Sequence, residues 1–153
     1  MPDVVDVTEL PTLKGRDIGT SRWMTVTQDQ ISTFATLTGD EQWIHVDSER
    51  AKGGPFGSTI AHGFFVLSCS TGLLYELLEV RGATQILNYG LNRVRFTAPT
   101  PVNSRVRMGL KVTDVADVSG GYQVTFGLTF EREGQEKPVC VAELLFRYYA
   151  PAS

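Results

Sequence analysis

The sequence predicts a single α+β domain in which an antiparallel sheet wraps around a long, buried helix. The length of 153 residues suits one hydrophobic core, and no internal repeat or linker divides the chain. Residues 62–79 are apolar at positions that cover most of a helix's circumference, as in a helix buried on nearly all sides. After Ala83 the pattern changes to strands separated by short turns, which favours a sheet that curves around that helix.

The segment before the first predicted helix divides into an arm and a strand. Residues 1–19 show little periodicity, and we expect an N-terminal arm with one short helical turn near residues 7–10. Residues 21–26 contain Trp23 and β-branched side chains, a composition typical of a strand.

Two short helices are expected ahead of the long one. Thr27 and Gln30 have the spacing of a capping box, and apolar residues follow at helical intervals. We therefore predict a helix over residues 28–37, which Gly39 ends in a left-handed conformation. Residues 47–52 have the pattern of a short capped helix, and the glycine-rich stretch that follows is predicted to be a loop.

Strands are predicted for the rest of the chain. The four candidates, rich in Val, Phe, Tyr and Thr, span residues 84–96, 104–118, 121–132 and 138–149. Glycines mark the turns between the last three, which predicts an antiparallel meander. The edges of such a sheet are open, and pairing of two subunits would cover one of them. We therefore expect a homodimer.

Composition argues against several classes of function. The formal net charge of -3 argues against general nucleic-acid binding, which requires a basic surface. The N-terminus lacks a basic region followed by an apolar stretch, so we expect no signal peptide. The apolar segment at residues 64–78 is too short and too often interrupted by polar residues to cross a bilayer. We expect a cytoplasmic protein with no nucleic-acid partner and no membrane insertion.

The cysteines indicate neither a disulfide nor a metal site. Cys69 and Cys140 each lie in an apolar run, which favours two buried thiols in a reducing compartment. The chain has no Cys-x-x-Cys motif and no paired histidines at ligand spacing, so we predict that no metal is bound.

The two histidines of the chain lie in the two segments with candidate chemistry. In residues 39–45, a turn presents the Asp40 carboxylate and the His45 imidazole. In residues 60–64, Gly63 offers an N–H at the predicted start of the long helix, where the first amides have no acceptor within the helix. These groups supply an acid, a base and an oxyanion donor, which are what the addition of water to a polarised double bond needs.

These motifs resemble those of the (R)-specific enoyl-CoA hydratases, also called the hydratase 2 or MaoC-like family, whose fold is the hotdog fold. The resemblance rests on Gly39-Asp40-x-Gln42-Trp43-Ile44-His45, on Ala61-His62-Gly63-Phe64 and on the strand Asn88–Phe96 with the proline-rich turn after it. It covers nearly all of the chain beyond residue 20. The family's pattern is Gly-Asp-x-Asn-Pro-apolar-His, and the Gln-Trp that replaces Asn-Pro here recurs as a variant within the family. The resemblance implies one hotdog domain over residues 1–153.

The resemblance also implies the reaction, a reversible and stereospecific hydration of trans-2-enoyl-CoA to (R)-3-hydroxyacyl-CoA. Asp40 and His45 would act on one water molecule, with the roles of acid and base left open between them, and the Gly63 N–H would bind the thioester oxygen. The coenzyme A thioester is the substrate, and no cofactor is implied. Acyl length, the choice between coenzyme A and acyl carrier protein, and the pathway within fatty acid or polyester metabolism stay open.

Five further residues of the motifs each have more than one interpretation. Gln42 either orients the reactive pair or satisfies backbone groups in its turn. Thr71 either takes the place of a serine that the family often has near the site or bonds to its own helix. Alternate residues of a strand face the same side, so Arg93 and Arg95 share one face. They either contact coenzyme A phosphates or are exposed to solvent without a ligand. For His62, a structural or helix-capping role is preferred over a catalytic role.

Two other functions are compatible with such a chain. A hotdog thioesterase would direct water at the carbonyl carbon and would not require the aspartate–turn–histidine arrangement. A non-catalytic subunit of a heteromeric dehydratase would bind acyl thioesters, but it would be expected to have lost the reactive pair that is present here.

Overall fold

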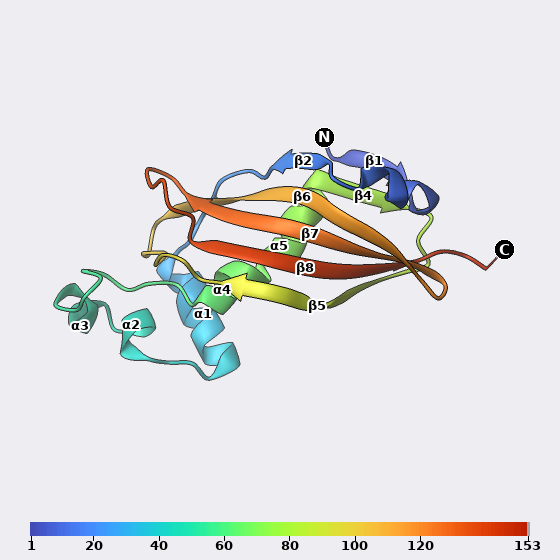
Figure 1. Cartoon of the computed structure of the whole chain (residues 1–153). Helices are drawn as coiled ribbons and strands as arrows, with labels where there is room; N and C mark the ends of the chain where they lie inside the picture. The colour runs from blue at the N-terminus through green and yellow to red at the C-terminus, as the bar shows by residue number, and fades with distance from the viewer. Residues whose placement is uncertain (153) are drawn as a thin grey trace.

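The computed structural model describes residues 1–152 and has one six-stranded sheet, with the helices α4 (Gly63–Ser68) and α5 (Ser70–Leu77) behind it in the view of Figure 1. The strands of this sheet are β2 Asp17–Thr20, β3 Met24–Thr25, β5 Gln85–Arg95, β6 Arg105–Val118, β7 Gly121–Arg132 and β8 Cys140–Tyr149. Their order is β2-β6-β7-β8-β5, and β3 also pairs with β6. The predicted α+β class and the four long strands are confirmed.

The connectivity differs from the predicted meander at β5. As predicted, β6, β7 and β8 are consecutive antiparallel neighbours, but β5 pairs with β8 rather than with β6. The segment that contains Pro99 and Pro101 takes the chain across to β6, and a backbone bridge between Ile60 and Pro101 fixes its course. β5 is therefore an edge strand of the sheet, with two irregularities in its register against β8.

The hydrophobic core lies between the inner face of the sheet and the helices. Along β6, β7 and β8 buried residues alternate with more exposed ones, as expected for a sheet with one face on the core. The side chains of these strands that belong to the core are Val106, Met108, Leu110, Val112, Val124, Phe126, Leu128, Phe130, Cys140, Ala142, Leu144, Phe146 and Tyr148. Full burial of one large apolar side chain stabilises the fold by roughly 1.5–3 kcal/mol, so this face is a main source of stability.

The predicted long helix is divided into α4 and α5 at Cys69, a turn residue that keeps right-handed helical angles. Its N–H donates to the Val66 carbonyl, three residues back, at 3.2 Å. The chain then leaves α5 directly into the short strand β4 (Leu78–Arg81), so the helix ends before residue 79. Within residues 1–152, no helix has both the length and the apolar character needed to span a bilayer.

The two helices are buried along one stripe rather than on nearly all sides. The buried residues of the stripe are Val66, Leu67, Ser70, Leu73 and Leu74. On the other side Phe64 is 68% exposed and Tyr75 is 51% exposed. The expectation of a helix enclosed all round therefore fails for the single chain, because its sheet covers only one side of the apolar surface.

The N-terminal segment packs into the fold and is not a free arm. β1 (Asp3–Asp6) pairs in parallel with β4, and the 3₁₀ helix η1 (Val7–Leu13) follows it. The apolar residues Val7, Leu10 and Leu13 of this helix are at most 1% exposed. The helical turn expected at residues 7–10 is present, whereas the strand expected over residues 21–26 is limited to the two residues of β3.

Both cysteines are free, and we predict that they react slowly in the folded protein. Burial raises the pKa of the Cys140 thiol to about 11, and burial also raises the pKa of the Cys69 thiol. Because the thiolate is the reactive species, a disulfide reagent at pH 8 should modify both thiols slowly in the native protein and rapidly in guanidinium. Absorbance of the released chromophore measures this, and fast labelling of native Cys140 would contradict its burial.

Candidate active site

Asp40 follows the helix α1 (Gln28–Thr38). Local interactions determine where this helix begins and where it ends. Thr27 and Gln30 form the predicted capping box, in which each side chain accepts the backbone N–H of the other residue. Gly39 ends the helix at φ +81°, a left-handed conformation that is strained for a residue with a side chain. The chain therefore leaves a rigid helix in a fixed direction and presents the Asp40 carboxylate, which is 51% exposed.

His45 is buried, and its hydrogen bonds define one tautomer. It lies on α2 (Trp43–Val46), and its main-chain carbonyl accepts a hydrogen bond from the Gln28 side chain at 2.8 Å. Its Nδ1 lies 2.7 Å from the carbonyl oxygen of Ile60. Because a carbonyl can only accept, we infer that Nδ1 bears the hydrogen and that the lone pair of the neutral ring is on Nε2.

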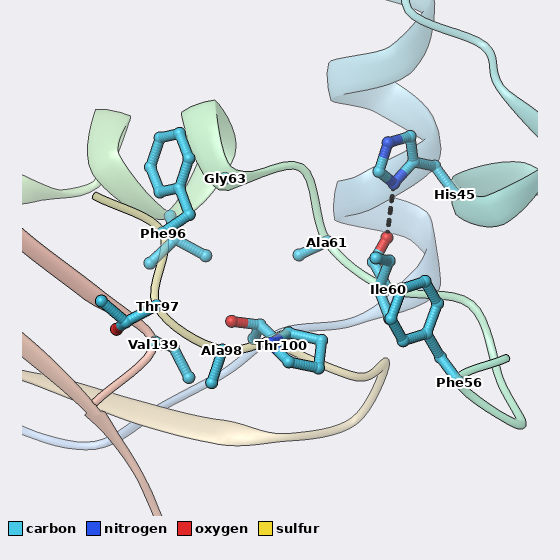
Figure 2. A pocket seen from close by; sticks show the side chains of 12 residues that line it. His45, Phe56, Ile60, Ala61, Gly63, Phe96, Thr97, Ala98, Thr100 and Val139 are labelled. Atoms are coloured by element: carbon cyan, nitrogen blue, oxygen red, sulfur yellow. Dashed lines mark hydrogen bonds between the residues drawn. The ribbon is translucent and has the colours of Figure 1, made fainter. Parts of the chain in front are cut away.

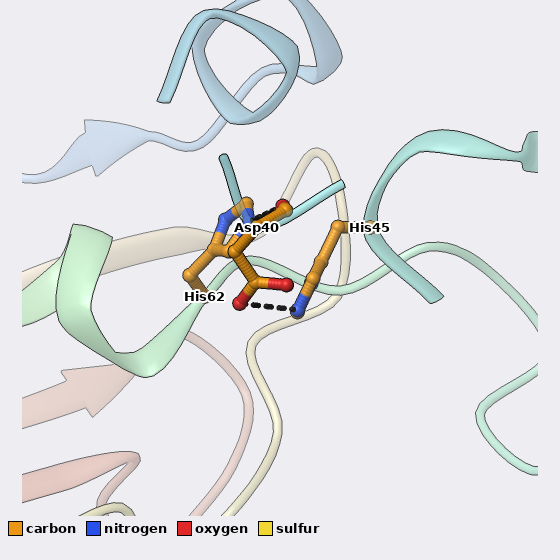
Figure 3. Close-up of side chains that lie close together, drawn as sticks. All are labelled: Asp40, His45 and His62. Carbon is orange, nitrogen blue, oxygen red and sulfur yellow. Dashed lines mark hydrogen bonds and ion pairs between the residues drawn. The ribbon is translucent and has the colours of Figure 1, made fainter. Parts of the chain in front are cut away.

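Asp40 and His45 approach each other through their reactive atoms (Figure 3). Nε2 of His45 lies 3.9 Å from Oδ2 of Asp40. This separation is too long for a direct hydrogen bond, but a water oxygen about 2.8 Å from both atoms fits at the apex of the triangle. The His45 side chain is 8% exposed, so the imidazole belongs to the interior while the carboxylate faces solvent. The pair can hold one water molecule between a free lone pair and a carboxylate.

His62 joins these two residues in a cluster of three. Its ring is stacked on the His45 ring, with centroids 3.8 Å apart and an angle of 24° between the planes. One potential ligand atom from each of Asp40, His45 and His62 lies within 4.8 Å of the others. The in-plane lone pairs of two stacked rings run side by side, however, and do not point at a common centre. The cluster is therefore a poor match for the converging ligands of a metal site.

A cavity of about 350 Å³ opens beside His45 (Figure 2), and its wall is mostly apolar. The residues that line it are His45, Phe56, Ile60, Ala61, Gly63, Val66, Phe96, Thr97, Ala98, Pro99, Thr100 and Val139. They come from α2, from the loop before α4, from α4 itself, from the connection after β5 and, for Val139, from the position just before β8. Asp40 is not part of this wall, and its side chain is half exposed.

Gly63 brings a main-chain N–H to the wall of the cavity. It is the first residue of α4, where an N–H has no acceptor within the helix. α4 has only six residues, so this single N–H, rather than a long helix dipole, is the group that can stabilise an anion. A Cβ at this position would lie 2.6 Å from carbons of the Phe96 ring. The closeness of Phe96 therefore requires glycine here.

Gln42 and Thr71 do not reach the cavity. The Gln42 side chain is exposed and makes no capping bond, although its carbonyl accepts the His45 N–H at 3.0 Å. Thr71 lies on α5, outside both the buried stripe and the cavity wall. The proposed role of each side chain at the site stays a prediction.

Arg93 and Arg95 lie on the outer face of the sheet. They pair with Glu143 and Val141 of β8, whose side chains alternate with the inward-facing Ala142 and its neighbours. The outer face is on the opposite side of the sheet from α4 and α5. Contact of these arginines with coenzyme A phosphates also stays a prediction.

Three contacts of the site were missed by sequence reasoning. The first is the bond of His62 to the Asp40 carbonyl, and the second is the Phe96 ring over Gly63. The third is a bond of 2.6 Å from the Thr59 hydroxyl to the side-chain oxygen of Gln28, which supports the bond of Gln28 to α2. Each joins residues that are far apart in the sequence, where no local spacing rule applies.

Comparisons with known proteins agree with this architecture. A family model described as the MaoC like domain matches residues 9–132. The 3-hydroxyacyl-thioester dehydratase Z of Mycobacterium tuberculosis is 49% identical over 145 residues, which cover 94% of this chain and 96% of the relative. A structure described as the monoamine oxidase regulatory protein from Archaeoglobus fulgius has a TM-score of 0.76 and 26% identity, and it covers 91% of this chain and 92% of its own. The (R)-hydratase from A. caviae involved in PHA biosynthesis has a TM-score of 0.72 at 20% identity, over 90% of this chain and 96% of its own.

The sheet wrapped over a helix is the hotdog fold, in agreement with the A. caviae hydratase structure. The chain belongs to the MaoC-like dehydratase family, since the family model covers most of its length and a relative named as a dehydratase is closely similar. The family resemblance carried by the two histidine segments is thereby confirmed.

We predict that Gly63→Ala destabilises the protein because the new methyl group overlaps the Phe96 ring. Overpacking of this kind costs roughly 1–3 kcal/mol. Truncation in Phe96→Ala makes room, so the same glycine substitution should cost much less in that background. Thermal unfolding of the wild type, the two single variants and the double variant measures this coupling. An equal cost of Gly63→Ala in both backgrounds would contradict the contact.

Proposed function

We propose that this protein catalyses the reversible hydration of trans-2-enoyl-CoA to (R)-3-hydroxyacyl-CoA. The observation that carries the proposal is the separation of 3.9 Å between Asp40 Oδ2 and His45 Nε2, beside an apolar cavity that Gly63 also lines. The 49% identity to a protein named as a 3-hydroxyacyl-thioester dehydratase supports the same reaction in the reverse direction.

In the proposed mechanism, Asp40 and His45 hold one water molecule against one face of the double bond. The free Nε2 lone pair of His45 makes it able to accept a proton from this water, while the Asp40 carboxylate orients the water. The water oxygen bonds to C3, and C2 takes up a proton from the pair. Since the pair delivers this one water molecule to a single face of the double bond, a single stereoisomer is produced. In the direction of dehydration the same groups exchange their roles of acid and base.

The charge that develops in this step is on the thioester oxygen, where the Gly63 N–H is proposed to act. As C3 is attacked, electrons move to that oxygen and form an enolate. A main-chain donor directed at such an oxyanion is typically worth on the order of 10²–10³ in rate. Gly63 also lines the cavity in which the thioester is proposed to bind. The reactants are water and the thioester alone, so we propose that no further cofactor takes part.

The cavity is proposed to hold the acyl chain. Its wall is lined by apolar side chains such as Phe56, Val66 and Val139. Its volume of about 350 Å³ is close to the lower end of the roughly 300–1,000 Å³ that is typical of ligand pockets. This favours short acyl chains over long ones. Arg93 and Arg95 would contact the coenzyme only if it extends over the outer face of the sheet.

We also propose that the chain forms a homodimer through β5. The exposed side of the helices adjoins this edge strand at both ends. Phe64 of α4 packs edge-on against Phe96, and Tyr75 of α5 lines a hollow together with Ile86. Leu91 of β5 is 42% exposed. An unpaired edge beside apolar surface is commonly covered by a second subunit. The free thiols support the proposal of a reducing, cytoplasmic location.

We predict that Asp40→Asn and His45→Ala each lower the kcat for hydration of 2-butenoyl-CoA by roughly 10²–10⁴. The matched control is Asp47→Asn, since Asp47 is a nearby carboxylate that caps α3 (Ser48–Lys52) and asparagine caps a helix equally well. Loss of enoyl absorbance measures the rate, and circular dichroism checks the fold. Asp40 is half exposed, so its variant should fold even if removal of the buried His45 side chain does not permit folding.

The same assay separates the competing functions. Release of free thiol, without loss of the enoyl group by hydration, would indicate a thioesterase instead. Binding of 2-butenoyl-CoA with turnover only after a partner protein is added would indicate a non-catalytic subunit. Near-normal turnover by Asp40→Asn would overturn the mechanism even if wild-type hydration is observed.

We predict that Leu91→Lys converts the dimer to a monomer, because it places a charge on the proposed interface. Light scattering after size-exclusion chromatography should give twice the chain mass for the wild type and the single chain mass for the variant. Leu37→Lys is the matched control, since Leu37 is an 81% exposed leucine on α1 rather than on β5. A wild-type monomer, or dimers of both variants, would exclude this interface.

A further inference from the structure

We propose that His62 is a positioning residue, which holds both Asp40 and His45 in their reactive arrangement. The inference deepens the proposed function, on which its kinetic part rests. His62 is 4% exposed and directly precedes Gly63 in the chain. It also contacts the other two groups of the proposed mechanism, Asp40 and His45. Figure 3 shows its ring beside the Asp40 main chain and the His45 ring.

The first contact fixes the main chain of Asp40. Nε2 of His62 lies 2.9 Å from the Asp40 carbonyl oxygen, which can only accept, so Nε2 bears the hydrogen and donates. Asp40 follows the end of α1, and its own N–H makes only a long contact of 3.5 Å with the Thr38 hydroxyl. The hydrogen bond from His62 is therefore the shorter of the two that hold the Asp40 main chain, while the Asp40 side chain is half exposed.

The second contact fixes the plane of the His45 ring. The His62 ring is stacked on it at 3.8 Å, and Phe34 packs on His62 with a centroid distance of 5.0 Å. Rotation within that plane is limited by the bond from His45 Nδ1 to the Ile60 carbonyl. Together these contacts direct Nε2 of His45 toward the Asp40 carboxylate.

The other nitrogen of His62 distinguishes a positioning role from simple filling of space. Nδ1 is buried and has no hydrogen-bond partner among the described residues. An unpartnered polar atom inside a protein destabilises the fold, and phenylalanine would fill the same space without one. The presence of histidine instead of phenylalanine at position 62 is thus explained by Nε2, which donates to the Asp40 carbonyl.

Two substitutions separate the two contacts. His62→Phe keeps a ring that can stack on His45 but lacks the donor to Asp40. His62→Gln keeps an amide donor that can reach the Asp40 carbonyl but removes the ring. A displacement of a reacting group by about 1 Å can cost on the order of 100-fold in rate. We therefore expect His62→Phe to lower kcat for 2-butenoyl-CoA roughly 10- to 100-fold, with KM changed less than about twofold.

The amide donor of His62→Gln should preserve part of the activity that His62→Phe loses. We expect His62→Gln to have a clearly higher kcat than His62→Phe, although its melting temperature should be the lower of the two because it loses ring packing. A purely structural role gives the opposite order, in which activity follows the melting temperature. A kcat of His62→Phe within twofold of the wild type would overturn the proposal.

A spectroscopic measurement tests the geometry independently of turnover. The chain has only two histidines, so a long-range ¹H–¹⁵N spectrum of histidine-labelled protein contains two ring patterns. We expect one ring protonated at Nδ1, from His45, and one protonated at Nε2, which disappears in His62→Gln and His62→Phe. Two rings of the same tautomer would overturn the proposal even if neither variant folds. If the wild type shows no hydration, the proposed function fails, while this spectrum still decides whether His62 holds Asp40.

Discussion

The hydrogen bond of 2.7 Å from His45 Nδ1 to the Ile60 carbonyl joins the two segments on which the site depends. The Ile60 N–H donates in turn to the Ile44 carbonyl at 3.0 Å, so residue 60 is held against α2 by both of its main-chain polar groups. On its other side the loop is tied to the connection between β5 and β6, because the Ala61 N–H donates to the Thr100 carbonyl at 2.8 Å. The direction of the imidazole and the course of the cavity wall follow from these bonds.

The uneven exposure of Asp40 and His45 has a physical reason. A buried imidazole is tolerated because its Nδ1 has a hydrogen-bond acceptor and the ring can stay neutral. Burial of an ionised carboxylate without a charged partner would cost far more, and the Asp40 side chain stays half exposed. Its position is instead set through its main chain, by Gly39 on one side and by the bond from His62 on the other.

Sequence patterns predicted the features that neighbouring residues decide, and they failed where distant contacts decide. The capping box of Thr27 and Gln30 defined the start of α1. The composition of residues 104–149 and the glycine turns within them defined three strands in the right order. The placement of β5 beside β8, and the packing of residues 7–13 into the core, depend on contacts that no local periodicity encodes. The interruption at Cys69 was not predicted because the apolar pattern continues through it.

The same distinction holds within the site. Asp40 and His45 share one turn, so their spacing alone placed them together, and the start of an apolar helix pointed to the free N–H of Gly63. The contact of Phe96 with Gly63 and the bond of His62 to Asp40 join residues from different elements. A local signal did exist for Gly63, but only the folded chain explains why no larger residue is accommodated there.

Ile60 acts at the site through two different parts of one residue. Its carbonyl fixes the imidazole of His45, while its side chain forms part of the cavity wall. Since any amino acid supplies the same carbonyl, a replacement at this position reshapes the space offered to the ligand without removing the bond that orients the reactive ring. The shape of the cavity can therefore change at this position while the orientation of the His45 ring is kept.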